Sequence, residues 1–214
     1  SKNKVYGSYV AEIYESCELN EEGTEVVDSK KLHKYDGAVF SRRSMNISGS
    51  GKLEVAAENE GLGSEMHMTI NGGDIKIKSG NDGINTSEDN ISVFTMNDGN
   101  VSIQVTGETG EGDGIDSNGW LIVNGGSVNT ASCATSSDAG IDADKGIYIN
   151  GGTVVASGNM AAEIADGEQH AVSFMSKEKL EAGEKYEIKD AEENVVMEIS
   201  PSNAFSMLAV SSEL

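Results

Sequence analysis

Ile70-Asn71-Gly72-Gly73 is the first of four related motifs in this 214-residue chain. The later copies are Met96-Asn97-Asp98-Gly99, Val123-Asn124-Gly125-Gly126 and Ile149-Asn150-Gly151-Gly152. Their asparagines are 26, 27 and 26 residues apart. A nearly fixed period of this length is typical of chains that wind into stacked coils, in which each coil contacts its neighbours. The repeat therefore predicts one elongated solenoid domain.

A second motif lies between the copies of the first and consists of an acidic residue, a glycine and an apolar residue. Its copies are Asp36-Gly37-Ala38, Glu60-Gly61-Leu62, Asp82-Gly83-Ile84-Asn85, Asp113-Gly114-Ile115-Asp116 and Asp138-Ala139-Gly140-Ile141-Asp142. Glycine reaches the positive φ angles of tight turns at little cost, so two kinds of turn are predicted in each coil.

The residues around each asparagine alternate between apolar and mixed character, as expected for a strand with one buried face. The residues one and three places before the asparagine are Met68, Ile70, Phe94, Met96, Leu121, Val123, Ile147 and Ile149. The inward residues after the turn are Ile75, Ile77, Val101, Ile103, Val128, Thr130, Val154 and Ala156. With a third strand after the acidic turn, each coil has the size of a turn of a single-stranded parallel β-helix.

The asparagines themselves are predicted to be structural, because stacked copies can form a ladder of side-chain amides. The predicted organisation is an N-terminal cap over residues 1–35, repeat coils over 36–158, and a C-terminal coil and cap over 159–214. Capping strands at both ends would close the exposed edges of one continuous all-β domain.

The formal net charge of −21 argues against nucleic acid and anionic membranes as partners, since both are bound through clustered Lys and Arg. It leaves cations, and ligands that are neutral or bridged by a cation. Cys17 and Cys133 either form a disulfide or remain free thiols. No apolar run is long enough for a transmembrane helix, and the chain starts without a recognisable export leader, so we expect a trimmed start.

The acidic motif predicts two columns of oxygen-bearing side chains along the coils. One holds Glu60, Asp82 and Asp113, and the other holds Asn85, Asp116 and Asp142, with Glu111 and Asp138 in neighbouring loops. Two carboxylates about 5 Å apart repel by about 1 kcal/mol in water and by about 3 to 4 kcal/mol at a dielectric constant near 20. Calcium accepts six to eight such oxygens in loose geometry. The columns therefore predict calcium, while solvated turn residues are the alternative.

Together the motifs resemble the bacterial carbohydrate-binding domain family first described on a clostridial surface protein. The resemblance covers about residues 36 to 214 and includes a tail with Tyr186-Glu187-Ile188-Lys189-Asp190 and Ile199-Ser200-Pro201. It implies a right-handed, pectate-lyase-like parallel β-helix that binds calcium and plant polysaccharides such as polygalacturonate or cellulose. It also implies an exported protein attached to the bacterial cell surface. The calcium ligands carried over from it are Asp82, Asn85, Glu111, Asp113, Asp116, Asp138 and Asp142.

The main hypothesis is a non-catalytic, calcium-binding module that binds polysaccharide as a monomer. Calcium would bridge the acidic chain to uronate carboxylates, or a neutral glycan would stack on Trp120 and Tyr148. One alternative is a calcium-dependent polysaccharide lyase, for which Lys76, Lys78 and Lys145 are the candidate bases. A structural or adhesive solenoid is the other alternative.

Overall fold

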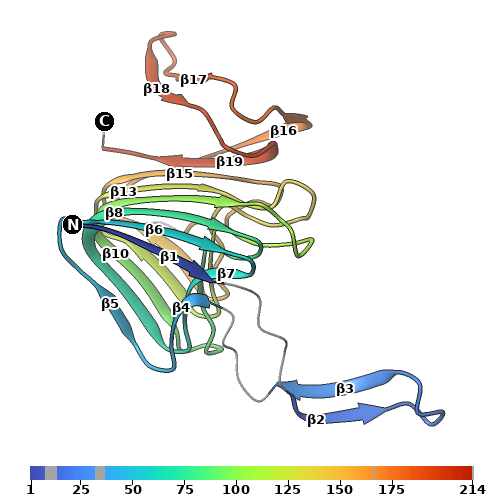
Figure 1. The fold of residues 1–214 in the computed structure, drawn as a ribbon. Helices are drawn as coiled ribbons and strands as arrows, with labels where there is room; N and C mark the ends of the chain where they lie inside the picture. The colour runs from blue at the N-terminus through green and yellow to red at the C-terminus, as the bar shows by residue number, and fades with distance from the viewer. Residues whose placement is uncertain (8–13, 32–36, 166, 214) are drawn as a thin grey trace.

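The chain is a parallel β-helix, as its repeats predict (Figure 1). The computed structural model describes residues 1–7, 14–31, 37–165 and 167–213. These residues form 19 strands and about five turns of solenoid. Within the same ranges there is no helix, and so none of a length and apolarity that would cross a membrane.

Each coil has three faces, and the strands of successive coils stack in parallel on each of them. The first face contains β5 (Met45–Ile47), the first halves of β8 (His67–Ser79) and β10 (Val93–Val105), β12 (Trp120–Val123) and β14 (Gly146–Ile149). The second face contains β1 (Lys2–Gly7), β6 (Lys52–Ala57), the second halves of β8 and β10, β13 (Ser127–Ala131) and β15 (Thr153–Gly158). The third face contains β4 (Gly37–Ser41), β7 (Glu60–Ser64), β9 (Ile84–Thr86) and β11 (Ile115–Ser117).

The predicted inward positions form one continuous core. All eight apolar residues before the asparagines have no solvent exposure, and the eight inward residues after the turn are at most 3% exposed. Core residues of adjacent coils lie side by side, as where Phe94 pairs with Met68 and Leu121. One detail of the prediction was wrong, because β8 and β10 continue through the asparagine turn as single strands. Separate strands flank the turn in the two later coils.

The asparagine ladder is present. The Nδ2 atom of each asparagine donates to the Oδ1 atom of the one in the preceding coil, at 2.8 Å from Asn97 to Asn71, 2.9 Å from Asn124 to Asn97 and 2.9 Å from Asn150 to Asn124. The last amide, Asn71, donates to the Ser48 hydroxyl at 3.3 Å. The turn also requires glycine beside the ladder. At Gly99, φ is 97° and a Cβ atom would lie 2.6 Å from the Gly73 carbonyl oxygen.

The N-terminal region has two different parts. Strand β1 pairs in parallel with β6 and so occupies the edge of the second face. Strands β2 (Tyr14–Leu19) and β3 (Val26–Lys31) pair antiparallel with each other, and this hairpin projects away from the coils (Figure 1). The expected strand from Val5 to Tyr14 is described only in part, since residues 8–13 lie outside the described ranges. Cys17 in the hairpin and the buried Cys133 are both free thiols.

The C-terminal segment covers the last coil with antiparallel strands. Strand β19 (Phe205–Ser211) pairs with β15, and β16 (Val172–Leu180) pairs with β19. Strands β17 (Tyr186–Lys189) and β18 (Val195–Ile199) form a hairpin above them (Figure 1). A second small core supports this arrangement, in which the rings of Tyr186 and Phe205 meet edge to face at 5.6 Å.

Candidate functional site

The third face carries the residues of the second predicted column on successive coils. Asn85 of β9 is in register with Asp116 of β11. A bridge between Ile115 and Ile141 extends the same register to Asp142. Ile84, Ile115 and Ile141 are fully buried, so the residue that follows each of them points outward. The structure thus brings Asn85, Asp116 and Asp142 into one line.

The first predicted column stabilises the coils through hydrogen bonds to the backbone. The Asp113 N–H donates to Asp82 Oδ1 at 2.7 Å, and the Ala139 N–H donates to Asp113 Oδ1 at 2.6 Å. Ala139 stands where the two preceding coils have an aspartate, so this column of carboxylates ends at Asp113. Asp82 and Asp113 thus each accept a hydrogen bond from the backbone of the next coil with one carboxylate oxygen.

The two columns meet in a compact cluster of carboxylates. One oxygen from each of Asp113, Asp116 and Asp142 lies within 4.8 Å of the other two, and all three side chains are partly buried. None of the ion pairs of the described residues involves these three aspartates. When ionised, these groups would concentrate negative charge on a few atoms that are only partly accessible to water.

This environment favours the protonated carboxyl groups. Burial, followed by repulsion from neighbouring carboxylates, raises the pKa of Asp113 to about 8 and that of Asp116 to about 7. Burial also raises the pKa of Asp142, and it raises the pKa of Asp82 well above its ordinary value. Removal of these protons at neutral pH therefore costs free energy unless a cation takes their place.

Asn85 adds an acceptor that has no donor. Its Nδ2 atom donates to Glu60 Oε1 at 2.9 Å and to Asp82 Oδ2 at 3.3 Å, which fixes the orientation of the amide. Its Oδ1 atom is buried and has no hydrogen-bond partner. A buried acceptor without a partner is unfavourable, and a bound water or ion is one way to satisfy it.

The two loop acids of the prediction lie in different environments. Asp138 accepts hydrogen bonds from the Gly112 N–H at 2.6 Å and from the Ser136 hydroxyl, and its charge raises the pKa of Asp113. Glu111 is exposed on its loop. Two acids near the cluster were not predicted. Asp144 raises the pKa of Asp116 and Asp142, and Glu163 raises that of Asp142.

Trp120 and Tyr148 lie on the first face, around the corner from Asp116. Trp120 is in register with Gly146, and Ile122 is in register with Tyr148 on the next coil. A Cβ atom at Gly146 would be 3.3 Å from the Tyr148 ring, so the ring lies over this glycine. Both aromatic side chains are partly exposed. They lie on neighbouring strands of this face, in successive coils.

The lysines considered as bases are not grouped. Lys76 and Lys78 project from the second face, whereas the carboxylate cluster is on the third. Lys145 is exposed and follows Asp144 directly at the corner before β14. Of the three, only Lys145 is adjacent in sequence to an acid near the cluster.

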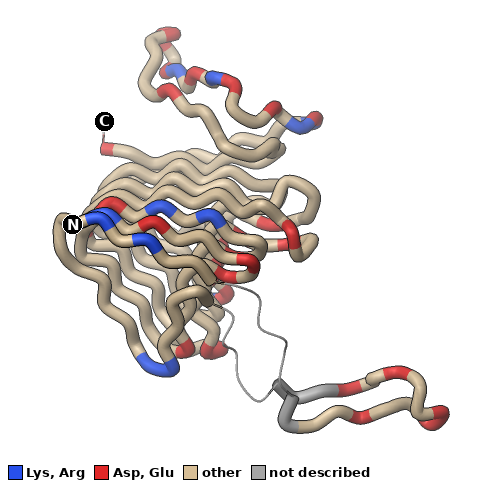
Figure 2. The backbone as a smooth tube through the Cα atoms, in the orientation of Figure 1, with Lys and Arg blue, Asp and Glu red and all other residues tan. Residues whose placement is uncertain are grey.

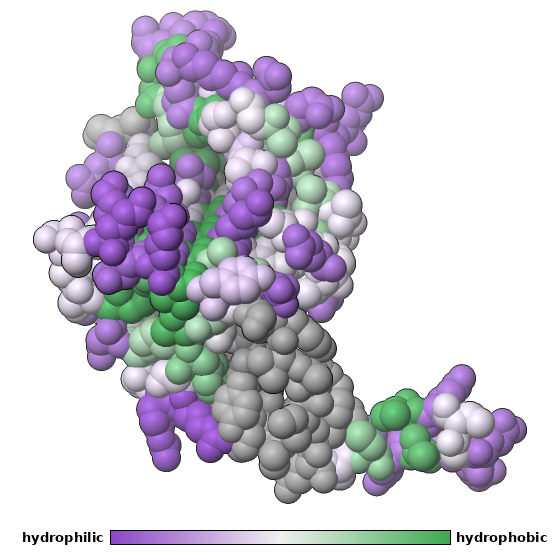
Figure 3. Space-filling view, viewed as in Figure 1, coloured by the Kyte–Doolittle hydropathy of each residue, from purple (hydrophilic) through white to green (hydrophobic). Residues whose placement is uncertain are grey.

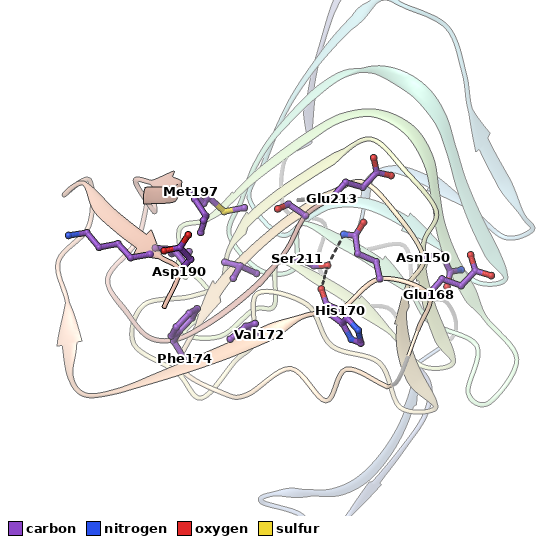
Figure 4. Close-up of a pocket in the computed structure, with 15 residues that line it drawn as sticks. Asn150, Glu168, His170, Val172, Phe174, Asp190, Met197, Ser211 and Glu213 are labelled. Atoms are coloured by element: carbon purple, nitrogen blue, oxygen red, sulfur yellow. Dashed lines mark hydrogen bonds between the residues drawn. The ribbon is translucent and has the colours of Figure 1, made fainter. Parts of the chain in front are cut away.

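A separate groove lies between the β16–β19 sheet and the β17–β18 hairpin (Figure 4). It has a volume of about 830 Å³, and its lining combines apolar side chains such as Val172 and Phe174 with polar and charged ones such as Glu168 and Asp190. At the base of the groove, Gln169 Nε2 donates to the Ser211 hydroxyl at 2.7 Å. This hydroxyl donates in turn to the His170 carbonyl oxygen at 2.7 Å. None of the predicted site residues lines this groove, so it is separate from the carboxylate cluster.

Comparison with known proteins identifies the family. A family model described as carbohydrate-binding domain-containing protein matches residues 15–205, which is most of the chain. No curated protein and no solved structure matches the chain. The family and the fold agree with the resemblance seen in the repeats. The chain therefore belongs to the carbohydrate-binding domain-containing protein family.

Proposed function

We propose that this protein is a non-catalytic polysaccharide-binding domain that holds calcium in the carboxylate cluster of its third face. The observation that carries the proposal is the convergence of Asp113, Asp116 and Asp142 to within 4.8 Å without a compensating lysine or arginine among the ion pairs of the described residues. Membership of a carbohydrate-binding family supports the glycan half of the proposal.

The donor set fits a hard cation. Carboxylate and amide oxygens are the ligands of calcium and magnesium, and the cluster contains neither histidine nor cysteine. Asp113, Asp116 and Asp142 would hold the ion, and the unpartnered Asn85 Oδ1 would add a neutral ligand. Calcium suits these mixed side chains better than magnesium, because its coordination is more flexible.

Bound calcium would give the acidic chain a way to bind acidic glycans. A divalent ion neutralises part of the cluster and can also accept oxygens from a sugar carboxylate or hydroxyl group. Trp120 and Tyr148 on the adjacent face would offer apolar surface to sugar rings. We infer that the ligands are plant cell-wall glycans such as polygalacturonate or cellulose. We also infer that the protein binds them as a monomer.

We also infer an extracellular location on the bacterial surface. Extracellular calcium modules work with dissociation constants of about 10⁻⁴ to 10⁻³ M, which suits a partly exposed cluster. Extracellular calcium above that concentration would occupy most of these sites.

The test is binding to polygalacturonate and to cellulose, each with calcium and with excess chelator. We expect calcium-dependent binding of polygalacturonate that is lost in the double variant Asp116→Asn/Asp142→Asn. It should be retained in Asp98→Asn, which changes an exposed acid on another face. Ultraviolet absorbance in the same samples reports unsaturated products of a lyase. Formation of such products would contradict the non-catalytic assignment, and binding that ignores calcium would contradict the role of the cluster.

A further inference from the structure

The second face carries an unusual concentration of positive charge for such an acidic chain. Figure 2 shows lysines over β1, β6 and β8. The residues are Lys2, Lys4, Lys52, Lys76 and Lys78, which are five of the 15 Lys and Arg residues of the protein. We call this surface the lysine face.

The register of the strands brings these side chains together. Lys2 is paired with Lys52, and Lys52 with Asp74 on the following strand. Lys4 is paired with Glu54, which is in turn paired with Lys76. Neighbouring strands are about 4.8 Å apart, and side chains on one face of a strand repeat every ~6.6 Å. The result is a flat array of charges.

Ion pairs neutralise only part of this array. Glu54 contacts Lys2 at 2.6 Å and Lys4 at 2.8 Å, and Asp74 contacts Lys52 at 2.9 Å. Lys76 and Lys78 are exposed, and neither takes part in an ion pair of the described residues. Glu58 lies at the turn end of the face, where it accepts a hydrogen bond from Tyr6. Glu108 also lies near this end of the face, beside Gly80. The five lysines therefore exceed the nearby acids Glu54, Asp74, Glu58 and Glu108 by one charge.

The surroundings of these two lysines are polar. Lys76 is in register with Ser102, which is paired with Asn129, and Lys78 is in register with Gln104. Figure 3 shows hydrophilic residues on this side of the molecule, with a hydrophobic strip beside them. The lysine face therefore offers ammonium groups next to neutral hydrogen-bonding groups on the outward surface of neighbouring strands.

We propose that the lysine face binds a linear anionic polysaccharide directly through Lys76 and Lys78, without calcium. The proposal rests on the proposed function, because family membership directs the choice of a glycan among polyanions. Its chemistry differs from that of the carboxylate cluster, because ammonium groups pair with uronate or sulfate groups without a bridging ion. Single exposed charge pairs are weak, but a polymer presents many charges to the same face and gains from avidity.

The test measures binding in excess chelator, so that the carboxylate cluster cannot contribute through calcium. The double variant Lys76→Gln/Lys78→Gln is compared with Lys177→Gln/Lys189→Gln, which removes the same charge from the C-terminal strands. The ligands are polygalacturonate, dextran sulfate, neutral dextran and duplex DNA. Thermal melts establish that each variant is folded.

We expect the wild type to bind an anionic glycan more weakly as salt is raised, and neutral dextran not at all. The first variant should bind about fivefold more weakly, as expected for two exposed charge contacts, and the control variant should be unchanged. The polygalacturonate and dextran sulfate samples distinguish uronate from sulfate recognition. Equal loss in both variants, or no loss in either, would overturn the proposal. Duplex DNA bound as tightly as the glycans would overturn the choice of polysaccharide.

These outcomes are independent of the calcium proposal. Calcium-dependent binding that survives in Lys76→Gln/Lys78→Gln would support the cluster, whatever happens in chelator. Chelator-resistant binding that survives in Asp116→Asn/Asp142→Asn would support the lysine face, even if calcium has no effect.

Discussion

Two ladders run along this solenoid, one made of amides and the other mainly of carboxylates. The first contains Asn71, Asn97, Asn124 and Asn150. Each amide has a donor and an acceptor, so the amides of successive coils form hydrogen bonds of 2.8 to 2.9 Å with one another. In the second, Asn85 is followed by Asp116 and Asp142 in the same stacked geometry. An ionised carboxylate accepts hydrogen bonds but cannot donate one.

The comparison shows what a repeated side chain requires from its surroundings. The amide ladder is complete within the protein, whereas the carboxylate ladder needs protons or a cation between its members. The pKa values of its members Asp116 and Asp142 are raised for this reason, as is that of the neighbouring Asp113. The same coil geometry can thus support either a structural element or a binding site, depending on whether the side chain can donate.

The largest predicted effect is the pH dependence of stability without calcium. The pKa values of about 8 for Asp113 and about 7 for Asp116 lie above the value of 3.8 expected when the chain is unfolded. Between about pH 4 and pH 8 the folded state therefore binds more protons, so the free energy of unfolding falls as pH rises. Urea melts in chelator should show a loss of several kcal/mol over this range, and saturating calcium should reduce the loss. A flat profile in chelator would contradict the proposed difference between the ladders.

Conversion of one carboxylate into an amide should have the next largest effect. Asp116→Asn keeps the shape of the side chain but removes a charge from the cluster. We expect the calcium-free protein to become more stable at pH 8 by about 1 to 3 kcal/mol, because a buried charge is lost. The variant should also lose most of the stabilisation by calcium. Asp98→Asn, measured in parallel, should change neither quantity.

The reciprocal exchange, Asn97→Asp, should weaken the amide ladder. The new carboxylate cannot donate to Asn71 Oδ1, although it can still accept from Asn124. The expected loss is about 1 kcal/mol, with or without calcium, because one hydrogen bond is removed at an exposed position. Asn129→Asp adds the same charge at an exposed site on β13 and serves as the control. Equal losses in the two variants would indicate a general effect of charge and not of the ladder.

The smallest predicted effect concerns neutral glycans, which can be bound without either ladder. Trp120→Ala should weaken binding of a neutral glycan such as cellulose by about 1 kcal/mol, because a partly exposed aromatic surface is lost. Calcium affinity should not change, since Trp120 is on a different face from the cluster. Pull-down with cellulose and calorimetry with calcium measure the two quantities. Unchanged cellulose binding would remove Trp120 from the glycan site.

Periodic features of this protein could be predicted from its sequence. The core positions, the amide ladder and the column of Asn85, Asp116 and Asp142 all follow from counting within one coil and stacking the result. Such stacking is reliable because the strands of adjacent coils keep one register on each side of the asparagine turn, with a local shift at Asp98 between β8 and β10. The groups around the cluster were harder to predict, because Asp144 and Glu163 have no counterparts at the same position of every coil.

Most features outside the repeat could not be predicted from the sequence. The pairing of Lys2 with Lys52 depends on β1 joining the second face, and the N-terminal segment lacks both motifs. The groove arises where the β17–β18 hairpin lies over β19, and no sequence period indicates that arrangement. The pKa of each aspartate also depends on burial, which the spacing of residues does not reveal.

Calorimetric titration of calcium into chelator-treated protein near neutral pH tests the central claim most directly. Repetition in buffers of different ionisation enthalpy also counts the protons released. We predict saturable binding accompanied by proton release, because the ion displaces protons held by Asp113 and Asp116. An absence of saturable binding, or binding without proton release, would contradict the assignment of the carboxylate ladder as a calcium site.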